Sequence, residues 1–377
     1  MKLKNIFKLA LVCIMTTVML SGCYPTGEKQ LPPNGGSGVS GTQGNAEASQ
    51  PFDGKVSEKL GDVELNYEIS PDFPTQLPKI RLKRKNLDTE LFKSVLFRNK
   101  TIVPPNEKIP DYVFYTTDNC MLVVAGDYLQ FSDENLINKL KHFDFFSSIW
   151  NKYYRVSSNQ LKSFSSAEAV EQVNKILDDL GIENYGEPGI VTVTPEEANA
   201  FFEKAGVVKV SENDYSDPNK EYIPWDEDDG LYILKYRFNY NGIDLCAANM
   251  KTLGTSREIQ GTDISVCITK DGITSIRANT MYDVVSLDDE TVDLKYNAKY
   301  ASDQLVEHYS KITAVNEPTF FTECKLEYIP LGLDNGEVVF TPAWCFMAYT
   351  VNVEDSTYLS DYAEYYYADT GRSYGGF

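Results

Sequence analysis

Short segments in which polar and apolar residues alternate recur along most of this chain, and they constrain its fold more than any other feature. The first, at 62–69, alternates with period two, which is typical of a half-buried strand. Strand-like runs follow at 79–82, 113–115, 121–125, 128–131, 231–239, 264–269, 272–278, 281–287, 320–329 and 337–351. Short turn sequences separate several of them, so we expect largely antiparallel pairing.

Signals for helix starts are fewer. They lie at Asp88, at Ser132, at Ser165 or Ser166, at Thr194-Pro195 and at Asn297-Ala298. The helix after Ser165 or Ser166 would carry one apolar face and end at Gly181. Together the patterns predict an α+β fold with largely antiparallel sheets and packed helices.

The first residues differ from the rest of the chain. Lys2, Lys4 and Lys8 precede an apolar run at 9–20, which is shorter than the ~20 apolar residues that a spanning helix needs. A basic start, a short apolar core and a small-residue exit describe a cleavable signal peptide at 1–22.

The exit is Leu20-Ser21-Gly22-Cys23, which resembles the lipobox of bacterial lipoproteins. In that family the cysteine thiol receives a diacylglycerol and the chain is cut just before it. The resemblance implies that Cys23 becomes the lipidated N-terminus, anchored on the extracytoplasmic face of the cell membrane. Two acyl chains anchor a protein stably where one gives marginal binding. A soluble secreted protein with a chance cysteine is the alternative.

Residues 23–59 are rich in Gly, Ser, Pro, Gln and Asn. Such a composition cannot bury enough surface to fold, so we predict a disordered tether of about 36 residues, reaching roughly 30–36 Å at ~5–6 Å × √n. A Gly-x-Gly-x-x-Gly match at 36–41 lacks the flanking strand and helix of a nucleotide site. Beyond the tether we expect two subdomains, an N-terminal α+β domain at 60–210 and a strand-rich α+β domain at 211–377.

The chain is strongly acidic, with a formal net charge of −20. That charge argues against nucleic acid as a partner and against a body lying flat on anionic lipid.

Five cysteines remain when Cys13 and Cys23 are set aside, so they cannot all pair within one chain. They are Cys120, Cys246, Cys267, Cys324 and Cys345. Most lie in apolar runs and are expected to be small buried hydrophobes, with one disulfide left open.

Candidate chemistry is sparse. Asp226, Asp228 and Asp229 could hold Ca²⁺, although their spacing is not that of an EF-hand and a solvated loop tip is the simpler interpretation. Gly-x-Ser-x-Gly, Ser-x-x-Lys and His-Glu-x-x-His motifs are absent. His142 and His308 are interpreted as surface or helix-end residues. Tyrosines crowd residues 358–374, where packing is preferred over a carbohydrate or peptide site.

Several short stretches are similar to a family of uncharacterised lipoproteins from clostridia and their relatives. They lie at 64–71, 77–81, 113–131, 180–182, 236–243, 272–276 and 340–344. The Gly-Ile strands and the later Pro342-Ala343-Trp344 also resemble, more distantly, extracytoplasmic regulators of the YycH and YycI type, which act on a membrane sensor kinase. Cys345 and Phe346, which follow the tryptophan, depart from the pattern.

The resemblance implies a non-enzymatic envelope protein and supplies no catalytic residues. We therefore expect a membrane-anchored lipoprotein that binds or regulates another envelope protein. A lipoprotein that binds peptides or glycans is the second hypothesis, and a hydrolase with a scattered active site is the third. No cofactor is expected beyond the lipid on Cys23.

Overall fold

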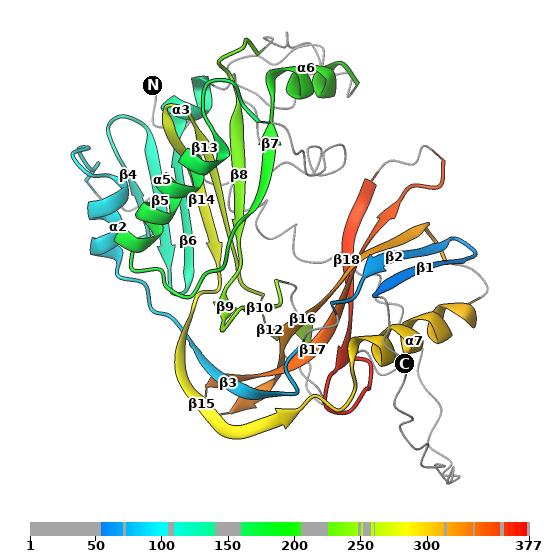
Figure 1. Cartoon of the computed structure of the whole chain (residues 1–377). Coiled ribbons are helices and arrows are strands. Elements are labelled where there is room, and N and C mark those ends of the chain that lie inside the picture. The colour runs from blue at the N-terminus through cyan, green and yellow to red at the C-terminus, as the bar shows by residue number, and fades with distance from the viewer. Residues whose placement is uncertain are drawn as a thin grey trace. The chain divides into compact units, whose positions relative to one another are not determined.

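The computed structural model describes residues 54–70, 73–104, 109–139, 160–204, 225–247, 250–251, 258–259, 261–312, 315–334, 336–354 and 358–374 (Figure 1). The signal peptide predicted at 1–22 and the tether residues 23–53 lie outside them. The tether prediction is wrong at its end, because residues 55–59 form most of the strand β1 (Lys55–Leu60). Asp53–Phe377 forms one compact unit. Strands far outnumber helices among the described residues, in two larger sheets and one two-stranded sheet of β11 (Met250–Lys251) and β12 (Glu258–Ile259).

The larger sheet has nine strands and is organised by a long hairpin. The hairpin joins β16 (Thr319–Asp334) and β17 (Glu337–Val351), which pair antiparallel over almost their whole length. The other strands are β1 (Lys55–Leu60), β2 (Val63–Glu68), β3 (Gln76–Arg84), β9 (Asn239–Tyr240), β10 (Ile243–Leu245), β15 (Tyr282–Asp293) and β18 (Tyr358–Tyr367). β2 and β10 run parallel to β16, so this sheet is mixed.

The smaller of the two large sheets has seven strands, all paired antiparallel, in the order β4-β5-β6-β14-β13-β8-β7. These are β4 (Val113–Tyr115), β5 (Cys120–Ala125), β6 (Tyr128–Asp133), β7 (Gly189–Val193), β8 (Leu231–Tyr236), β13 (Asp263–Thr269) and β14 (Gly272–Asn279). β5 and β6 form a tight hairpin in which Gly126 takes the positive φ of 64° that the turn requires.

Helix α5 (Ser166–Asp179) contacts β8 and β13 on one face of the seven-stranded sheet (Figure 1). Ser165 and Glu168 form a capping box at its start, and Ala169, Val173 and Leu177 are buried. Full burial of an aliphatic side chain such as Leu177 contributes about 1.5–3 kcal/mol, so this face holds the helix on the sheet. Gly181 follows the helix with a φ of 64°.

The other four described helices are shorter than α5. They are α2 (Thr89–Leu96), α3 (Glu134–Lys139), α6 (Pro195–Lys204) and α7 (Ala298–Ser310), of which α7 contacts β1 in the nine-stranded sheet. Asp88 caps α2 as predicted, through the backbone N–H groups of Glu90 and Leu91.

The prediction that Ser132 caps the next helix is wrong. Ser132 belongs to β6, and the Asp133 carboxylate accepts the N–H groups of Asn135 and Leu136 at the start of α3. A carboxylate one residue further on serves the same capping role. The predicted remainder of that helix, 140–146, lies outside the described residues.

Strand pairing does not follow the boundary predicted at residue 211. β1, β2 and β3 come from the first half of the chain and share a sheet with strands from the last hundred residues, whereas β14 pairs with β6 from the first half. Each large sheet therefore contains strands from both predicted segments, because pairing partners lie up to 260 residues apart in the sequence, as Ile80 and Phe340 do.

Candidate functional site

A small pocket lies where the chain passes from the seven-stranded sheet to the nine-stranded one. β14 ends at Asn279 and β15 begins at Tyr282, so only Thr280 and Met281 separate strands of different sheets. Thr280 has a φ of 43°, a conformation that β-branched residues rarely adopt. The direct crossing stores backbone strain at this point.

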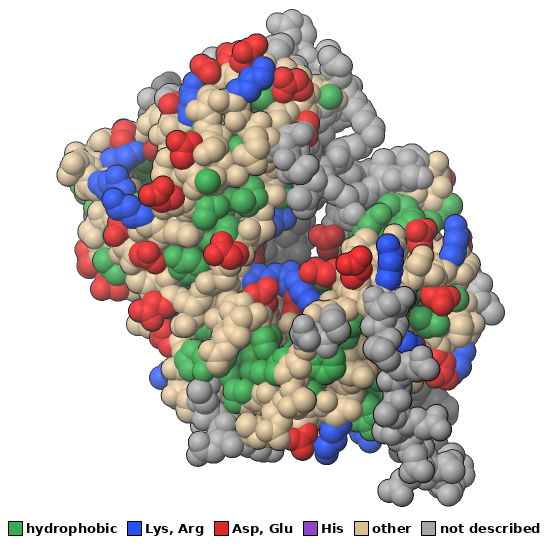
Figure 2. Space-filling model, viewed as in Figure 1, with side chains coloured by type: hydrophobic (Ala, Val, Ile, Leu, Met, Phe, Trp, Pro, Cys, Tyr) green, Lys and Arg blue, Asp and Glu red, His purple; other side chains and the backbone are tan. Residues whose placement is uncertain are grey.

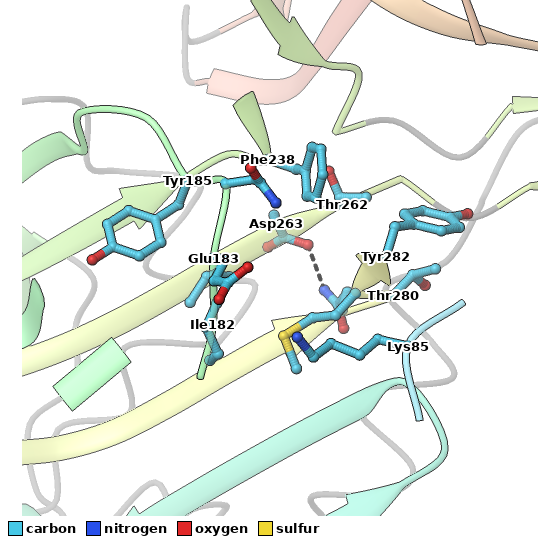
Figure 3. A pocket seen from close by; sticks show the side chains of 13 residues that line it. Lys85, Ile182, Glu183, Tyr185, Phe238, Thr262, Asp263, Thr280 and Tyr282 are labelled. Atoms are coloured by element: carbon cyan, nitrogen blue, oxygen red, sulfur yellow. Dashed lines mark hydrogen bonds between the residues drawn. The ribbon is translucent and has the colours of Figure 1, made fainter. Parts of the chain in front are cut away.

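The pocket contains a partly buried acid, Asp263, next to the buried hydroxyl of Thr262. Asn279 Nδ2 donates to Asp263 Oδ1 at 2.6 Å, and Figure 3 shows Asp263 with Lys85 and Thr280 on one side and Glu183 on the other. Burial raises the pKa of the Asp263 carboxyl, although Asn279 and nearby cations oppose the shift. The buried Thr262 Oγ1 has no hydrogen-bond partner among the described residues.

The volume of this pocket decides what it can hold. It measures about 20 Å³, enough for roughly one water molecule but far below the ~300–1,000 Å³ of pockets that bind small organic ligands. Lys85, on its rim, is already engaged by the Gly181 carbonyl at 3.0 Å and by Asp283 at 3.2 Å. In this conformation the pocket suits a structural role at the crossing.

A buried ion pair lies close to the same crossing. Arg237, just after β8, places Nη1 2.5 Å from Oε1 of Glu327 on β16, and the Glu327 side chain is fully buried. Lys325 Nζ lies 3.2 Å from the same oxygen, and the Tyr365 hydroxyl donates to Oε2 at 3.4 Å. The pair joins a residue next to the seven-stranded sheet to the centre of the nine-stranded one.

A second buried carboxylate has tyrosines around it. Glu364 accepts hydrogen bonds from the hydroxyls of Tyr309, Tyr362 and Tyr366, and Tyr309 and Tyr362 are also within hydrogen-bond distance of each other. Burial, followed by the charge of Glu364, raises the pKa of Tyr309 and of Tyr362. These phenols therefore remain protonated donors that stabilise the carboxylate.

The C-terminal tyrosines serve packing where they are described. Tyr365, Tyr366 and Tyr367 are buried, and the preference for packing over an exposed binding cluster is confirmed for these three. Tyr374 packs against Tyr365 and Tyr367.

A surface pocket beside α2 and α5 is lined by five charged side chains. The pocket, which we call the Lys100 pocket, measures about 470 Å³. Its charged lining residues are Arg98, Lys100, Lys175, Asp133 and Asp271. Cations outnumber acids there, in a chain whose overall charge is −20.

Lys100 connects this pocket to a buried thiol. Its Nζ lies 2.8 Å from Asp133 Oδ2, 3.3 Å from Asp118 Oδ2 and 2.7 Å from Cys120 Sγ. Burial raises the pKa of Cys120 to about 11, with Lys100 opposing the shift. Burial alone would lower the pKa of Lys100, but its hydrogen bonds to Asp133 and Cys120 raise it instead.

The predicted site residues fall in different places. Leu20, Ser21, Gly22 and Cys23 lie outside the described residues, as does His142. His308 lies in the last turn of α7. None of the five remaining cysteines forms a disulfide within the described part of the chain, and Cys120, Cys246, Cys267 and Cys345 are buried, as expected of small hydrophobes.

The calcium candidates form a turn of their own. Asp226 Oδ1 accepts the Asp228 N–H, Asp229 Oδ2 accepts the Asp226 N–H, and Lys270 pairs with Asp228 at 2.8 Å. Within the described part of the chain, no group of three or more His, Cys, Asp or Glu side chains is arranged to hold a metal ion. A calcium site at Asp226, Asp228 and Asp229 stays a prediction.

Figure 2 shows acidic and basic side chains interspersed over the face it presents, with hydrophobic side chains in separate patches. Among the described helices, none has both the length and the apolar character to cross a membrane.

Comparison with known proteins identifies the fold alone. No protein-family model matches this sequence, and no curated protein matches it. The chain is similar in structure to an uncharacterised protein from Eubacterium rectale ATCC 33656, with a TM-score of 0.61 and 16% sequence identity. The similarity covers 83% of this chain and 90% of that protein, so the two share one architecture over most of their lengths.

Proposed function

We propose that this protein is a lipoprotein, anchored through Cys23 to the extracytoplasmic face of a membrane, and that its folded body binds or regulates another envelope protein. The observation that carries the proposal is the order of Lys2, Lys4, Lys8, the apolar run at 9–20 and Leu20-Ser21-Gly22-Cys23. The Gly- and Ser-rich segment that follows ends where β1 begins at Lys55.

The body suits a binding role through its surface. An open groove runs between α5 and the edge strand β7, lined in part by Val170, Asn174 and Ile190. Within the described part of the chain, β7 pairs with β8 on one side and has no paired strand on the other. An open strand edge can hydrogen-bond an added strand, which is a common mode of peptide and protein recognition. We also propose that the body has two subdomains with packed helices, each built on one of the two large sheets.

The clostridial resemblance supports the same proposal, as does the strongly acidic composition, which favours a solvated body held away from anionic lipid. We propose a non-enzymatic role, with neither calcium nor nucleic acid required.

Photo-crosslinking in cells tests the binding role. A photoreactive residue at Asn174 or Ile190, in the groove beside β7, should capture one specific envelope protein, identified by mass spectrometry. The same probe at Lys59 on β1 serves as the control for proteins that are merely abundant near the membrane. Equal recovery of the same proteins from both positions would contradict a docking role for the groove.

A further inference from the structure

The contact between Lys100 and Cys120 is too close for ordinary packing. Its 2.7 Å separation is as short as the ~2.7–2.9 Å of a charge-assisted N–H···O bond, although sulfur is a larger atom than oxygen. A separation of this size matches a nitrogen and a sulfur bonded to one shared oxygen atom.

The fold places the two side chains together through several independent constraints. Cys120 and Asp133 are directly opposite in the β5–β6 pairing, so the thiol and the carboxylate lie side by side on one face of the sheet. The Lys100 N–H is held by the Phe97 carbonyl at 2.8 Å, and the next residue, Thr101, accepts the Thr117 N–H at 2.9 Å. These backbone hydrogen bonds fix the segment that carries Lys100, so its side chain reaches Cys120 from a defined position.

We infer that Lys100 and Cys120 form a covalent N–O–S bridge when the protein meets dioxygen, and that this pair is an oxidation-sensitive crosslink beside the Lys100 pocket. The Lys100 ammonium, the Cys120 thiol and one dioxygen molecule give the bridge, one water molecule and one proton. The lysine nitrogen and the sulfur each lose two electrons, and dioxygen gains four. One oxygen atom stays between nitrogen and sulfur, and the other leaves as water.

The neighbouring groups suit this reaction. Asp133, 2.8 Å from Lys100 Nζ, can take the proton that frees the nitrogen lone pair. The Lys100 side chain is 28% exposed and lines the pocket, which gives a small uncharged oxidant access to the otherwise buried thiol. The raised pKa of Cys120 keeps its side chain a thiol, which is less reactive than a thiolate. Oxidation of Cys120 at this site therefore depends on the neighbouring Lys100 amine.

Bridge formation would change the pocket in two ways. The Lys100 cation disappears, so Asp133 and Asp118 lose their partner and the lining of Arg98, Lys175 and Asp271 becomes less positive. The segment after α2 also becomes tied to the start of β5, which restricts the unfolded chain as a disulfide does.

Peptide mass spectrometry of the full chain tests the inference. Protein prepared without oxygen should contain free Lys100 and Cys120. Air-exposed protein should yield a crosslinked peptide pair that has gained one oxygen and lost two hydrogens, and that a thiol reductant separates. Lys100→Arg should abolish the product, whereas Lys93→Arg on the preceding helix α2 should not.

Thermal unfolding provides a second readout that does not require peptide recovery. Air exposure should raise the midpoint for the natural sequence and for Lys93→Arg, and a thiol reductant should reverse the rise. Lys100→Arg and Cys120→Ser should show no such response. An unmodified Lys100 with a fully alkylatable Cys120 after air exposure would overturn the inference, as would oxidation of Cys120 alone to sulfenic or sulfonic acid.

Discussion

Removal of the Arg237 side chain should destabilise this protein far more than removal of an exposed arginine. Arg237→Met removes the closest cation from the Glu327 carboxylate, whose side chain has no solvent exposure. Loss of one partner of a buried ion pair costs about 3–5 kcal/mol, because the remaining charge is neither hydrated nor compensated.

The geometry narrows this range. Lys325 Nζ stays 3.2 Å from Glu327 Oε1 and the Tyr365 hydroxyl stays 3.4 Å from Oε2, so part of the charge remains compensated. Arg237 is also about one quarter exposed, which weakens its own contribution. We therefore expect a loss near the lower end, about 3 kcal/mol.

Urea unfolding followed by tryptophan fluorescence measures this loss. With a slope of about 3 kcal/mol/M, the midpoint should fall by roughly 1 M. Arg84→Met is the matched control, since Arg84 is 52% exposed and pairs with Asp127 at 3.6 Å, a contact expected to contribute about 0–1 kcal/mol.

A double variant separates the ion pair from other effects. Arg237→Met combined with Glu327→Leu removes both charges, so it should be more stable than Arg237→Met alone. A stabilising role for this ion pair is contradicted if Arg237→Met is no more destabilising than Arg84→Met. It is also contradicted if adding Glu327→Leu recovers none of the free energy of unfolding.

Three further changes test the local structure. Burial raises the pKa of the Asp263 carboxyl, so the free energy of unfolding should fall as pH rises from about 3.8 through the folded pKa, and Asp263→Asn should remove this part of the pH dependence in urea titrations. Ser165→Ala should lower the free energy of unfolding by about 1 kcal/mol through loss of the α5 cap, and Ser166→Ala by less; equal losses would contradict the capping role. Gly371→Ala should lower the thermal midpoint more than Gly336→Ala, because both have positive φ but the new Cβ at Gly371 would meet a tyrosine ring at 2.7 Å; similar losses would contradict the clash.

Local features of the fold were predictable from the sequence. Period-two alternation identified β2, and the start signals at Asp88, at Ser165 or Ser166 and at Thr194-Pro195 identified α2, α5 and α6. These patterns depend on residues within one or two turns of each other, which a sequence displays directly.

Long-range pairing was not predictable in the same way. β2 runs parallel to β16, and the register Val63↔Thr319 joins residues far apart in the chain. Nothing in either strand specifies the other, since both only require an apolar face.

The charged clusters were missed for a related reason. Arg237 and Glu327 come together only after both sheets form, and Lys100 meets Cys120 only through the β5–β6 hairpin and the segment after α2. An isolated lysine in a loop and a cysteine at a strand start carry no spacing that marks them as a pair. The Glu364 cluster was hidden in the tyrosine-rich segment at 358–374.

Intact mass spectrometry of the protein extracted from cell membranes shows whether Cys23 carries the proposed lipid anchor. The mature chain should begin at Cys23 and carry the mass of a diacylglycerol on that residue, while Cys23→Ser should leave an unlipidated protein that still contains residues 1–22 or is released from the membrane. An unmodified Cys23 in the natural-sequence protein, or a mature N-terminus at another residue, would contradict anchoring through Cys23.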